Sequence, residues 1–254
     1  MLFTRMFSRR WIILSILAAI MAVTMIRLGI WQLDRLKQRR SLNSQVLSET
    51  SQPVLILNQE SVLEDLAGME YRKVQVRGTY DPTHEVALGN QAYQGKYGVH
   101  LLTPLKIEHT DRYILVDRGW VPGEDVQSSD WSRFSEPGTV EVLGVLRNAQ
   151  QKSGLALLSN TASIQELNGH QIWMFVNIAE LEKQSGYTYE NVYIQQSPDP
   201  NQATLPYRTE PELDLTEGPH LGYALQWFTF ASIVLIGYPL YIKREEGQSR
   251  KFHA

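Results

Sequence analysis

Residues Trp11–Ile26, WIILSILAAIMAVTMI, and residues Tyr223–Tyr241, YALQWFTFASIVLIGYPLY, are two apolar runs without a charged side chain. The first run continues past one arginine as far as Trp31. Because an α-helix rises about 1.5 Å per residue, each run reaches roughly 30 Å as a helix, the hydrocarbon thickness of a bilayer. The runs therefore predict two transmembrane helices, one near each end of the chain.

The stretch between the two runs is polar and long enough to bury a core of its own. The chain has 254 residues, and its slightly negative mean hydropathy fits two spans joined to a soluble domain. The expected segments are an N-terminus at 1–10, transmembrane helix 1 at 11–33, a β-rich domain at 34–220, transmembrane helix 2 at 221–241 and a C-terminus at 242–254.

The charges that flank the second run indicate its orientation. Basic residues follow it, whereas the residues before it are acidic. Since basic flanks remain cytoplasmic, we expect both termini in the cytoplasm and the central domain outside it. A cleaved signal peptide is the alternative for the first run, but that run is longer than a usual signal core and no small-x-small site follows it.

Composition excludes several classes of function. The chain has no cysteine, so disulfides, cysteine-based zinc sites and thiol nucleophiles are absent from it. Its net charge of −3 gives no basic field for a nucleic acid. No phosphate-binding loop, nucleophile elbow or closely spaced histidine pair is present. We therefore expect no enzyme and no protein-only metal site.

Short β-branched or alternating segments fill the middle of the chain, separated by turn residues such as those at Gly89-Asn90 and Pro137-Gly138. Expected helices are fewer: Gln59–Ala67, Ala162–Leu167, Ile178–Gln184, and an extension of the first membrane helix over Asp34–Ser48. This pattern predicts two transmembrane helices flanking an α+β, mainly antiparallel β extramembrane domain. The expected strands are Tyr71–Gly78, Glu85–Leu88, Tyr97–Thr103, Arg112–Val121, Thr139–Leu146, Trp173–Asn177 and Asn191–Gln196.

Several strings, in order along nearly the whole chain, together resemble the surfeit locus protein 1 family, the bacterial-type membrane proteins that assist cytochrome c oxidase assembly. The more specific strings lie at Arg118–Pro122 (RGWVP) and His220–Phe228 (HLGYALQWF). The others are Leu28–Arg35 (LGIWQLDR), Glu70–Val74 (EYRKV), Gly98–Leu105 (GVHLLTPL) and Gly144–Arg147 (GVLR).

The resemblance implies a chaperone-like role in maturing the catalytic subunit of a haem–copper oxidase of the respiratory chain. It implies haem a as a transiently bound cofactor, with delivery to cytochrome c oxidase subunit I, and haem a synthase as a second partner. It also implies the cell inner membrane, with the central domain in the periplasm. A structural scaffold that stabilises subunit I without binding cofactor is the alternative.

His220 is the position at which the resemblance implies an axial ligand to haem iron. Pro219 suits the first turn of a helix, so the second membrane helix is expected to begin around Gly218–His220. Tyr223 and Trp227 follow on the same helix face. The alternative interpretation is an interfacial polar residue above an ordinary aromatic belt of a membrane helix.

Two further groups are candidates for interaction with a partner. Trp31, Gln32 and Arg35 lie at the outer end of the first span and are expected to dock either the second helix or the oxidase subunit. Arg118 offers a guanidinium for a carboxylate or propionate, with Trp120 beside it. Packing inside the domain is the alternative for this second pair.

Overall fold

The computed structural model describes residues 6, 8–59, 66–126, 130–149, 164–167, 169–200 and 204–252, the last seven of these without their side chains. It divides into two compact units. We call the first, Met1–Gln45 with Asp214–Ala254, the helix pair, and the second, Val46–Leu213, the β unit. Each unit is described by itself.

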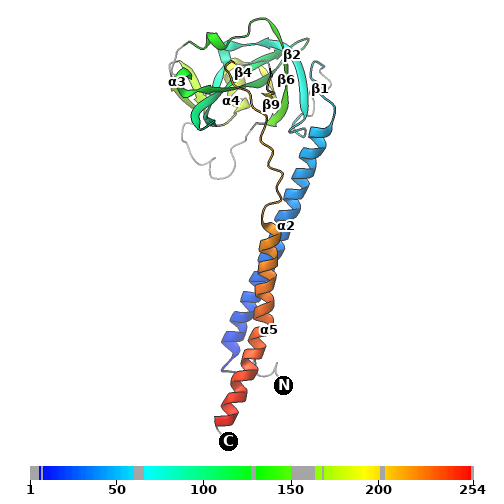
Figure 1. Cartoon of the computed structure of the whole chain (residues 1–254), viewed down its shortest axis with the longest axis vertical. Coiled ribbons are helices and arrows are strands. Elements are labelled where there is room, and N and C mark those ends of the chain that lie inside the picture. Colours follow the sequence, from blue (N-terminus) through cyan, green and yellow to red (C-terminus); the bar gives the residue numbers. More distant parts are fainter. Residues whose placement is uncertain are drawn as a thin grey trace. The chain divides into compact units, whose positions relative to one another are not determined.

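The helix pair consists of helix α2, Ile12–Ser51, up to Gln45, together with helix α5, His220–Phe252, and the segment before it (Figure 1). Both helices are long and apolar enough to cross a membrane. Helix α2 continues without a break through its charged second half, which confirms the predicted helical extension. Helix α5 begins directly after Pro219, as the sequence predicts.

A seam of buried and half-buried residues joins the two helices. Small residues, Ala22 and Gly29 on α2 and Ala224 and Ala231 on α5, lie at its centre, which lets the helix backbones approach closely. The alternating spacing of three and four residues is that of left-handed coiled-coil packing. The seam begins at Trp11, directly before α2, and on α2 it comprises Ser15, Ala18, Ala22, Met25, Gly29, Gln32, Leu36, Arg39 and Asn43.

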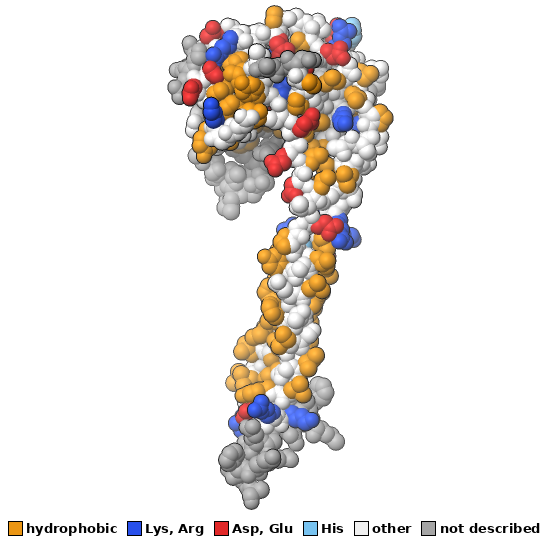
Figure 2. Space-filling model, viewed as in Figure 1, with side chains coloured by type: hydrophobic (Ala, Val, Ile, Leu, Met, Phe, Trp, Pro, Cys, Tyr) orange, Lys and Arg blue, Asp and Glu red, His pale blue; other side chains and the backbone are white. Residues whose placement is uncertain are grey.

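The outer surface of the helix pair is apolar. Figure 2 shows hydrophobic side chains along its visible face, with charged side chains gathered toward the two ends. Leucine, isoleucine and valine side chains on both helices are exposed there, for example Ile13, Val23, Ile233 and Ile236. In water such a surface would be unfavourable, whereas it matches the apolar solvent of a bilayer.

In the β unit, the described residues form a nine-stranded sheet in the order β1-β2-β6-β9-β5-β4-β3-β8-β7. An additional pairing of β2 with β4 closes five of these strands into a barrel. Antiparallel pairings predominate, as predicted, although β1–β2, β3–β8 and β5–β9 are parallel. The strands are β1 Leu55–Ile56, β2 Lys73–Tyr80, β3 Val86–Tyr93, β4 Lys96–Ile107, β5 Arg112–Pro122, β6 Thr139–Asn148, β7 Ile164–Leu167, β8 His170–Trp173 and β9 Thr188–Gln196.

Alternation along the strands creates the core of the β unit. In β2, for example, Val74 and Val76 point inward while their neighbours are more exposed. The barrel interior is filled by apolar side chains from all five closing strands, including Leu105, Ile107, Ile114, Val116, Val142, Leu146 and Ile194.

Short helices complete the β unit. They are α3, Gly123–Val126, and α4, Ile178–Ser185, with 3-10 turns η2 at Pro82–His84 and η3 at Ser132–Phe134. Helix α4 agrees with the sequence prediction. The side chain of Asn177 accepts a hydrogen bond from the Glu180 amide at its start, and Gly186 ends it in the left-handed conformation.

Three predictions for the middle of the chain need comment. The strand expected at Trp173–Asn177 is wrong beyond Trp173, because Asn177 caps α4 and the chain turns before it. The helix expected at Ala162–Leu167 is wrong from Ile164 onward, since those residues pair with β8 as strand β7. The helix expected at Gln59–Ala67 lies largely outside the described residues.

Candidate functional site

The candidate site is the head of the helix pair, where α5 begins. Nδ1 of His220 lies 2.8 Å from Oε1 of Gln32 on α2. An amide oxygen only accepts hydrogen bonds, so Nδ1 is the donor and carries the ring proton. The lone pair of the neutral ring is then on Nε2, the nitrogen that is available to bind a metal.

The other ring nitrogen has no protein partner. Among the described residues no hydrogen bond reaches Nε2 of His220. Gly218 adopts a left-handed conformation with φ 68°, which favours glycine. A Cβ built on Gly218 would lie 3.5 Å from Nε2 and 3.4 Å from the neighbouring ring carbon. A side chain at residue 218 would therefore contact this edge of the imidazole, and glycine places none there.

The segment that enters α5 is fastened to α2 by polar contacts, which we call the clasp: Arg39, Arg40 and Asn43 on α2 with Asp214–Glu217. Arg39 donates from Nε to the Thr216 carbonyl at 2.9 Å, and from Nη2 to Asp214. The amide nitrogen of Asn43 donates to the Leu215 carbonyl at 2.6 Å. Arg40 makes a two-pronged pair with Glu217, both contacts at 2.8 Å. The clasp fixes the backbone immediately before His220.

The carboxylates of the clasp are held in their charged form. Hydrogen bonds from Thr216, followed by the charge of Arg39, lower the pKa of Asp214. The hydrogen bond from Arg40 lowers the pKa of Glu217. Both side chains are solvent-exposed, so water and salt screen the contribution of these ion pairs to stability.

Two aromatic residues follow His220 on α5. Tyr223 is 47% exposed and Trp227 is half-buried, with its ring edge-to-face on Phe230 at 6.3 Å between centroids. Ala224, by contrast, is buried in the seam. A neutral imidazole nitrogen beside an apolar, aromatic helix surface fits an iron porphyrin with an apolar tail.

The predicted group Trp31, Gln32 and Arg35 divides between two sides of α2. Gln32 turns toward α5 and contacts His220, whereas Trp31 is 49% exposed. The guanidinium of Arg35 lies over the Trp31 ring at 5.6 Å and donates to Gln38. The structure therefore brings Gln32 into the site and leaves Trp31 and Arg35 as an outward-facing pair.

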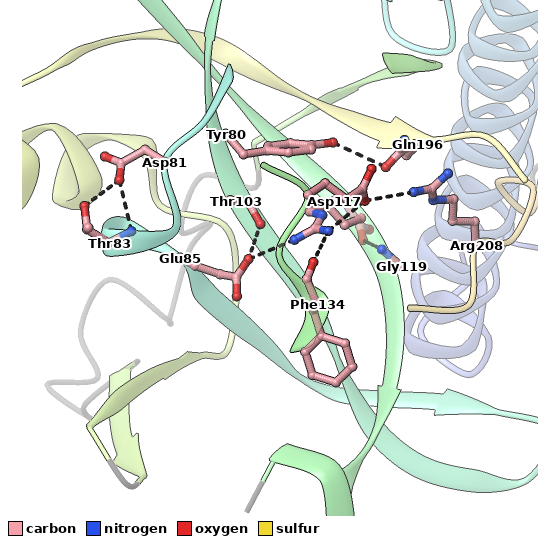
Figure 3. A network of polar contacts seen from close by, with 12 residues as sticks. Tyr80, Asp81, Thr83, Glu85, Thr103, Asp117, Gly119, Phe134, Gln196 and Arg208 are labelled. Carbon is pink, nitrogen blue, oxygen red and sulfur yellow. Dashed lines mark hydrogen bonds and ion pairs between the residues drawn. The ribbon is translucent and has the colours of Figure 1, made fainter. Parts of the chain in front are cut away.

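Arg118 lies inside the β unit, on β5, and is 2% exposed. Its guanidinium pairs with Glu136 at 2.7 Å and with Glu85 at 3.3 Å, donates to the Phe134 carbonyl, and lies 4.8 Å from the centroid of the Tyr80 ring. Figure 3 shows this network from close by, with Thr103 and Glu85 turned toward each other. Burial raises the pKa of Glu85, so the paired arginine offsets an otherwise unfavourable charge. Packing within the domain accounts for Arg118.

Trp120 is likewise internal to the β unit. Its ring is stacked on Tyr207 at 6.3 Å, and the Trp120 and Tyr207 backbones form an antiparallel bridge. Gly119 has φ 120° at the bulge between β4 and β5, and a Cβ there would meet the Tyr207 carbonyl oxygen at 2.6 Å. Nδ1 of His100 on β4 lies 2.8 Å from a carboxylate oxygen of Asp117.

Within the part of the chain that the structure describes, no group of three or more histidine or carboxylate side chains is arranged to hold a metal ion. A single histidine suffices when the other ligands come from a porphyrin.

Two features of the site were missed by reasoning from the sequence. The three-four spacing of α2 from Trp11 to Asn43 would have placed Gln32 on the inner face, one helical step away from Trp31. The opposite charges of Arg39-Arg40 and of Asp214 and Glu217 would have suggested the clasp. The acidic residues served only as an indicator of membrane orientation.

Comparison with known proteins points to one family. The sequence model of the SURF1 family matches residues 19–232, which include every residue of the head of the helix pair. A SURF1-like protein of Rickettsia conorii is 28% identical over 225 residues, covering 87% of each chain. A SURF1-like protein of Caenorhabditis elegans is 23% identical over 255 residues, or 90% of this chain and 74% of the relative. Surfeit locus protein 1 of Takifugu rubripes is 27% identical over 153 residues, 54% of this chain and 61% of the fish protein.

Proposed function

The chain belongs to the SURF1 family, and from this premise we propose that it is a membrane-anchored assembly factor for cytochrome c oxidase that holds haem a and assists its insertion into subunit I. The observation that carries the haem proposal is His220 at the start of α5, with Nδ1 occupied by Gln32 and with Nε2, beside Gly218, free of any hydrogen bond from the described residues. Family membership supports the assembly role, and the geometry at His220 supports the cofactor.

Anchorage in the inner membrane is part of the proposal. It is supported by two helices of sufficient length and apolar character, and by the basic residues Lys243 and Arg244 after the second apolar run. In this arrangement both termini are cytoplasmic and the β unit is periplasmic. The head of the helix pair then lies at the periplasmic boundary of the bilayer, where tyrosine and tryptophan are favoured.

The residues at the head of the helix pair have separate roles in holding the cofactor. His220 offers Nε2 as an axial ligand, and Tyr223 and Trp227 offer apolar ring surface beside it. When bound, haem a supplies an iron centre that accepts the imidazole nitrogen. Because Tyr223 is half exposed, the site is not enclosed by the chain's own side chains. An open, singly ligated site suits transfer to the histidines of subunit I, with haem a synthase as the supplier and no covalent reaction catalysed by this chain.

A structural scaffold is the second candidate, and the outward-facing Trp31 and Arg35 favour it. Trp31 is exposed at the end of an apolar run, with Arg35 stacked over it. Exposed tryptophan and arginine are the residues most often found at the energetic centre of protein interfaces. In this alternative, the chain stabilises an early intermediate of subunit I through its helices and never binds haem.

The experiment that tests the proposal is purification of the full chain from membranes of cells that make haem a. The wild-type chain is compared with His220→Ala and with Trp31→Ala, and both haem absorption and co-purified subunit I are measured. We expect a haem Soret band that His220→Ala removes and Trp31→Ala leaves intact. Subunit I without any haem band in the wild-type chain would favour the scaffold, and full haem in His220→Ala would remove His220 from the role.

A further inference from the structure

A glutamine on one apolar helix meets the histidine at the start of the other. We propose that Gln32 is a positioning residue for His220: its amide oxygen holds the imidazole in the tautomer that carries its proton on Nδ1 and presents Nε2 to the iron. The inference rests on the proposed function for its purpose, but the hydrogen bond itself exists without cofactor.

The contact has the geometry of a supporting partner of a metal ligand. Histidines that bind metals usually donate their other ring N–H to an oxygen acceptor, which fixes both tautomer and ring orientation. Here the Nδ1–Oε1 distance is 2.8 Å and the partner comes from the facing helix, 188 residues away in sequence. Without an acceptor at Gln32, the ring would be free to place its proton on Nε2, and Nε2 would then have no lone pair to offer the iron.

Gln32 is itself held in place from two sides along α2. One turn toward the N-terminus, Gly29 lies directly against the Phe228 ring, and a Cβ on Gly29 would come within 2.6 Å of that ring. One turn toward the C-terminus, Leu36 is buried in the seam. The clasp at Arg39 and Asn43 then fixes the segment that leads into His220. Both partners of the hydrogen bond are therefore placed by contacts other than the hydrogen bond.

A hydrogen bond between two membrane helices can also serve association alone, since polar side chains that pair in apolar surroundings stabilise helix pairs. The two roles differ in one observable. An association role is met equally if the Gln32 amide turns over and its NH₂ group donates to an unprotonated Nδ1, whereas a positioning role requires the proton on Nδ1. The tautomer of His220 is thus the property to measure.

The first arm is nitrogen NMR of the full chain, labelled with ¹⁵N-histidine and solubilised in detergent without haem. The His220 signal is identified by its loss in His220→Asn. We expect a protonated Nδ1 and an unprotonated Nε2 in the wild type, and a mixture of tautomers in Gln32→Met. A wild-type signal with the proton on Nε2 would overturn the inference, whatever the haem measurements show.

The second arm is titration of the purified full chain with haem a, read from its absorption. Gln32→Met removes the acceptor with little change of volume, while Gln32→Glu keeps an acceptor in the same place. We expect about 10- to 100-fold weaker binding for Gln32→Met, a loss typical of removing such a partner, and near wild-type binding for Gln32→Glu. Equal binding by the wild type and Gln32→Met would contradict the inference. Equal binding by the wild type and His220→Ala would instead refute the proposed ligand, so the two failures are distinguishable.

Discussion

The helix pair and the β unit each contain a polar group in otherwise apolar surroundings, but the two groups differ in how many polar partners the chain gives them. In the β unit, the guanidinium of Arg118 pairs with Glu85 and Glu136 and donates to a carbonyl, although its Nε has no hydrogen-bond partner among the described residues. In the helix pair, His220 uses only one ring nitrogen, and no described residue forms a hydrogen bond with the other, which lies beside Gly218. The Arg118 network pairs charges inside the β unit, whereas Nε2 of His220 is the atom that we propose binds a ligand.

The two more specific strings of the family resemblance, RGWVP and HLGYALQWF, differ in this respect. Arg118 and Trp120 of the first string make their contacts inside the β unit. His220, which begins the second string, uses only one of its two ring nitrogens in a hydrogen bond. Substitutions in the β unit should therefore change stability, and substitutions at the head of the helix pair should change ligand binding.

The largest expected effect is on the β unit, from Arg118→Met. Removing one partner of a buried charge network typically costs about 3–5 kcal/mol, and here the carboxylate of Glu85 would stay buried without its arginine. We expect this loss in chemical denaturation of the full chain in detergent, followed by tryptophan fluorescence. The matched control is Arg133→Met, which breaks the exposed pair with Asp125 and should cost about 0–1 kcal/mol.

The loss of stability caused by Arg118→Met should depend on pH. Burial raises the pKa of Glu85, so the folded state binds this proton more tightly than the unfolded state does. Stability contributed by that proton is present below the ordinary glutamate pKa and is lost as the pH rises through the raised value. Destabilisation by Arg118→Met should therefore shrink at acidic pH, and adding Glu85→Gln should restore part of the loss at neutral pH. An unchanged loss in the double variant would contradict the network.

The next largest effect is expected in the helix pair, from Gly29→Val. The added side chain would meet the Phe228 ring, and overpacking of a close contact typically costs about 1–3 kcal/mol. Amide hydrogen exchange should become faster at the facing ends of α2 and α5, with no change in the β unit. Gly237→Val is the control, since nothing lies within 4 Å of a Cβ at that position. Equal effects of the two valines would mean that the seam is not packed as described.

The smallest expected effect comes from the clasp. The pKa values of Asp214 and Glu217 are lowered in the folded chain, so their contribution is present above the ordinary carboxylate values and fades as the pH falls through the lowered ones. The backbone amides at 214–217 should lose protection from hydrogen exchange below about pH 4, after the rates are corrected for the pH dependence of the chemical exchange step. Arg40→Gln should remove part of this pH dependence, and protection that is independent of pH in the wild type would exclude the clasp.

Much of this architecture follows from simple sequence patterns. Uncharged runs of sufficient length predict both long helices, and alternation of apolar and polar residues predicts most strands. The strand at Ile164–Leu167 was not predicted, because its conformation depends on pairing with β8 rather than on local preference. Closure of the barrel was not predictable either, since the β2–β4 pairing joins segments whose register is set by tertiary packing.

The candidate site was predicted in part. Pro219 before a histidine indicates where α5 begins, and resemblance draws attention to His220. The partner of that histidine depends on which face of α2 meets α5. Gln32 and Trp31 are adjacent in sequence, yet one lies in the seam and the other is exposed. The helical periodicity that starts from the small residues Ala22 and Gly29 assigns Gln32 and Trp31 to different faces of α2. Their proximity in sequence does not reveal this difference.

The central claim is that His220 binds iron at the open head of the helix pair, and exchange of the ligand tests it most directly. The chain has no cysteine, so His220→Cys introduces the only thiol. The variant is purified in full length from cells that make haem a, and its absorption and magnetic circular dichroism spectra are recorded. We predict that the wild-type spectrum is replaced by that of a thiolate-ligated haem. A full complement of haem with the wild-type spectrum unchanged would contradict the account.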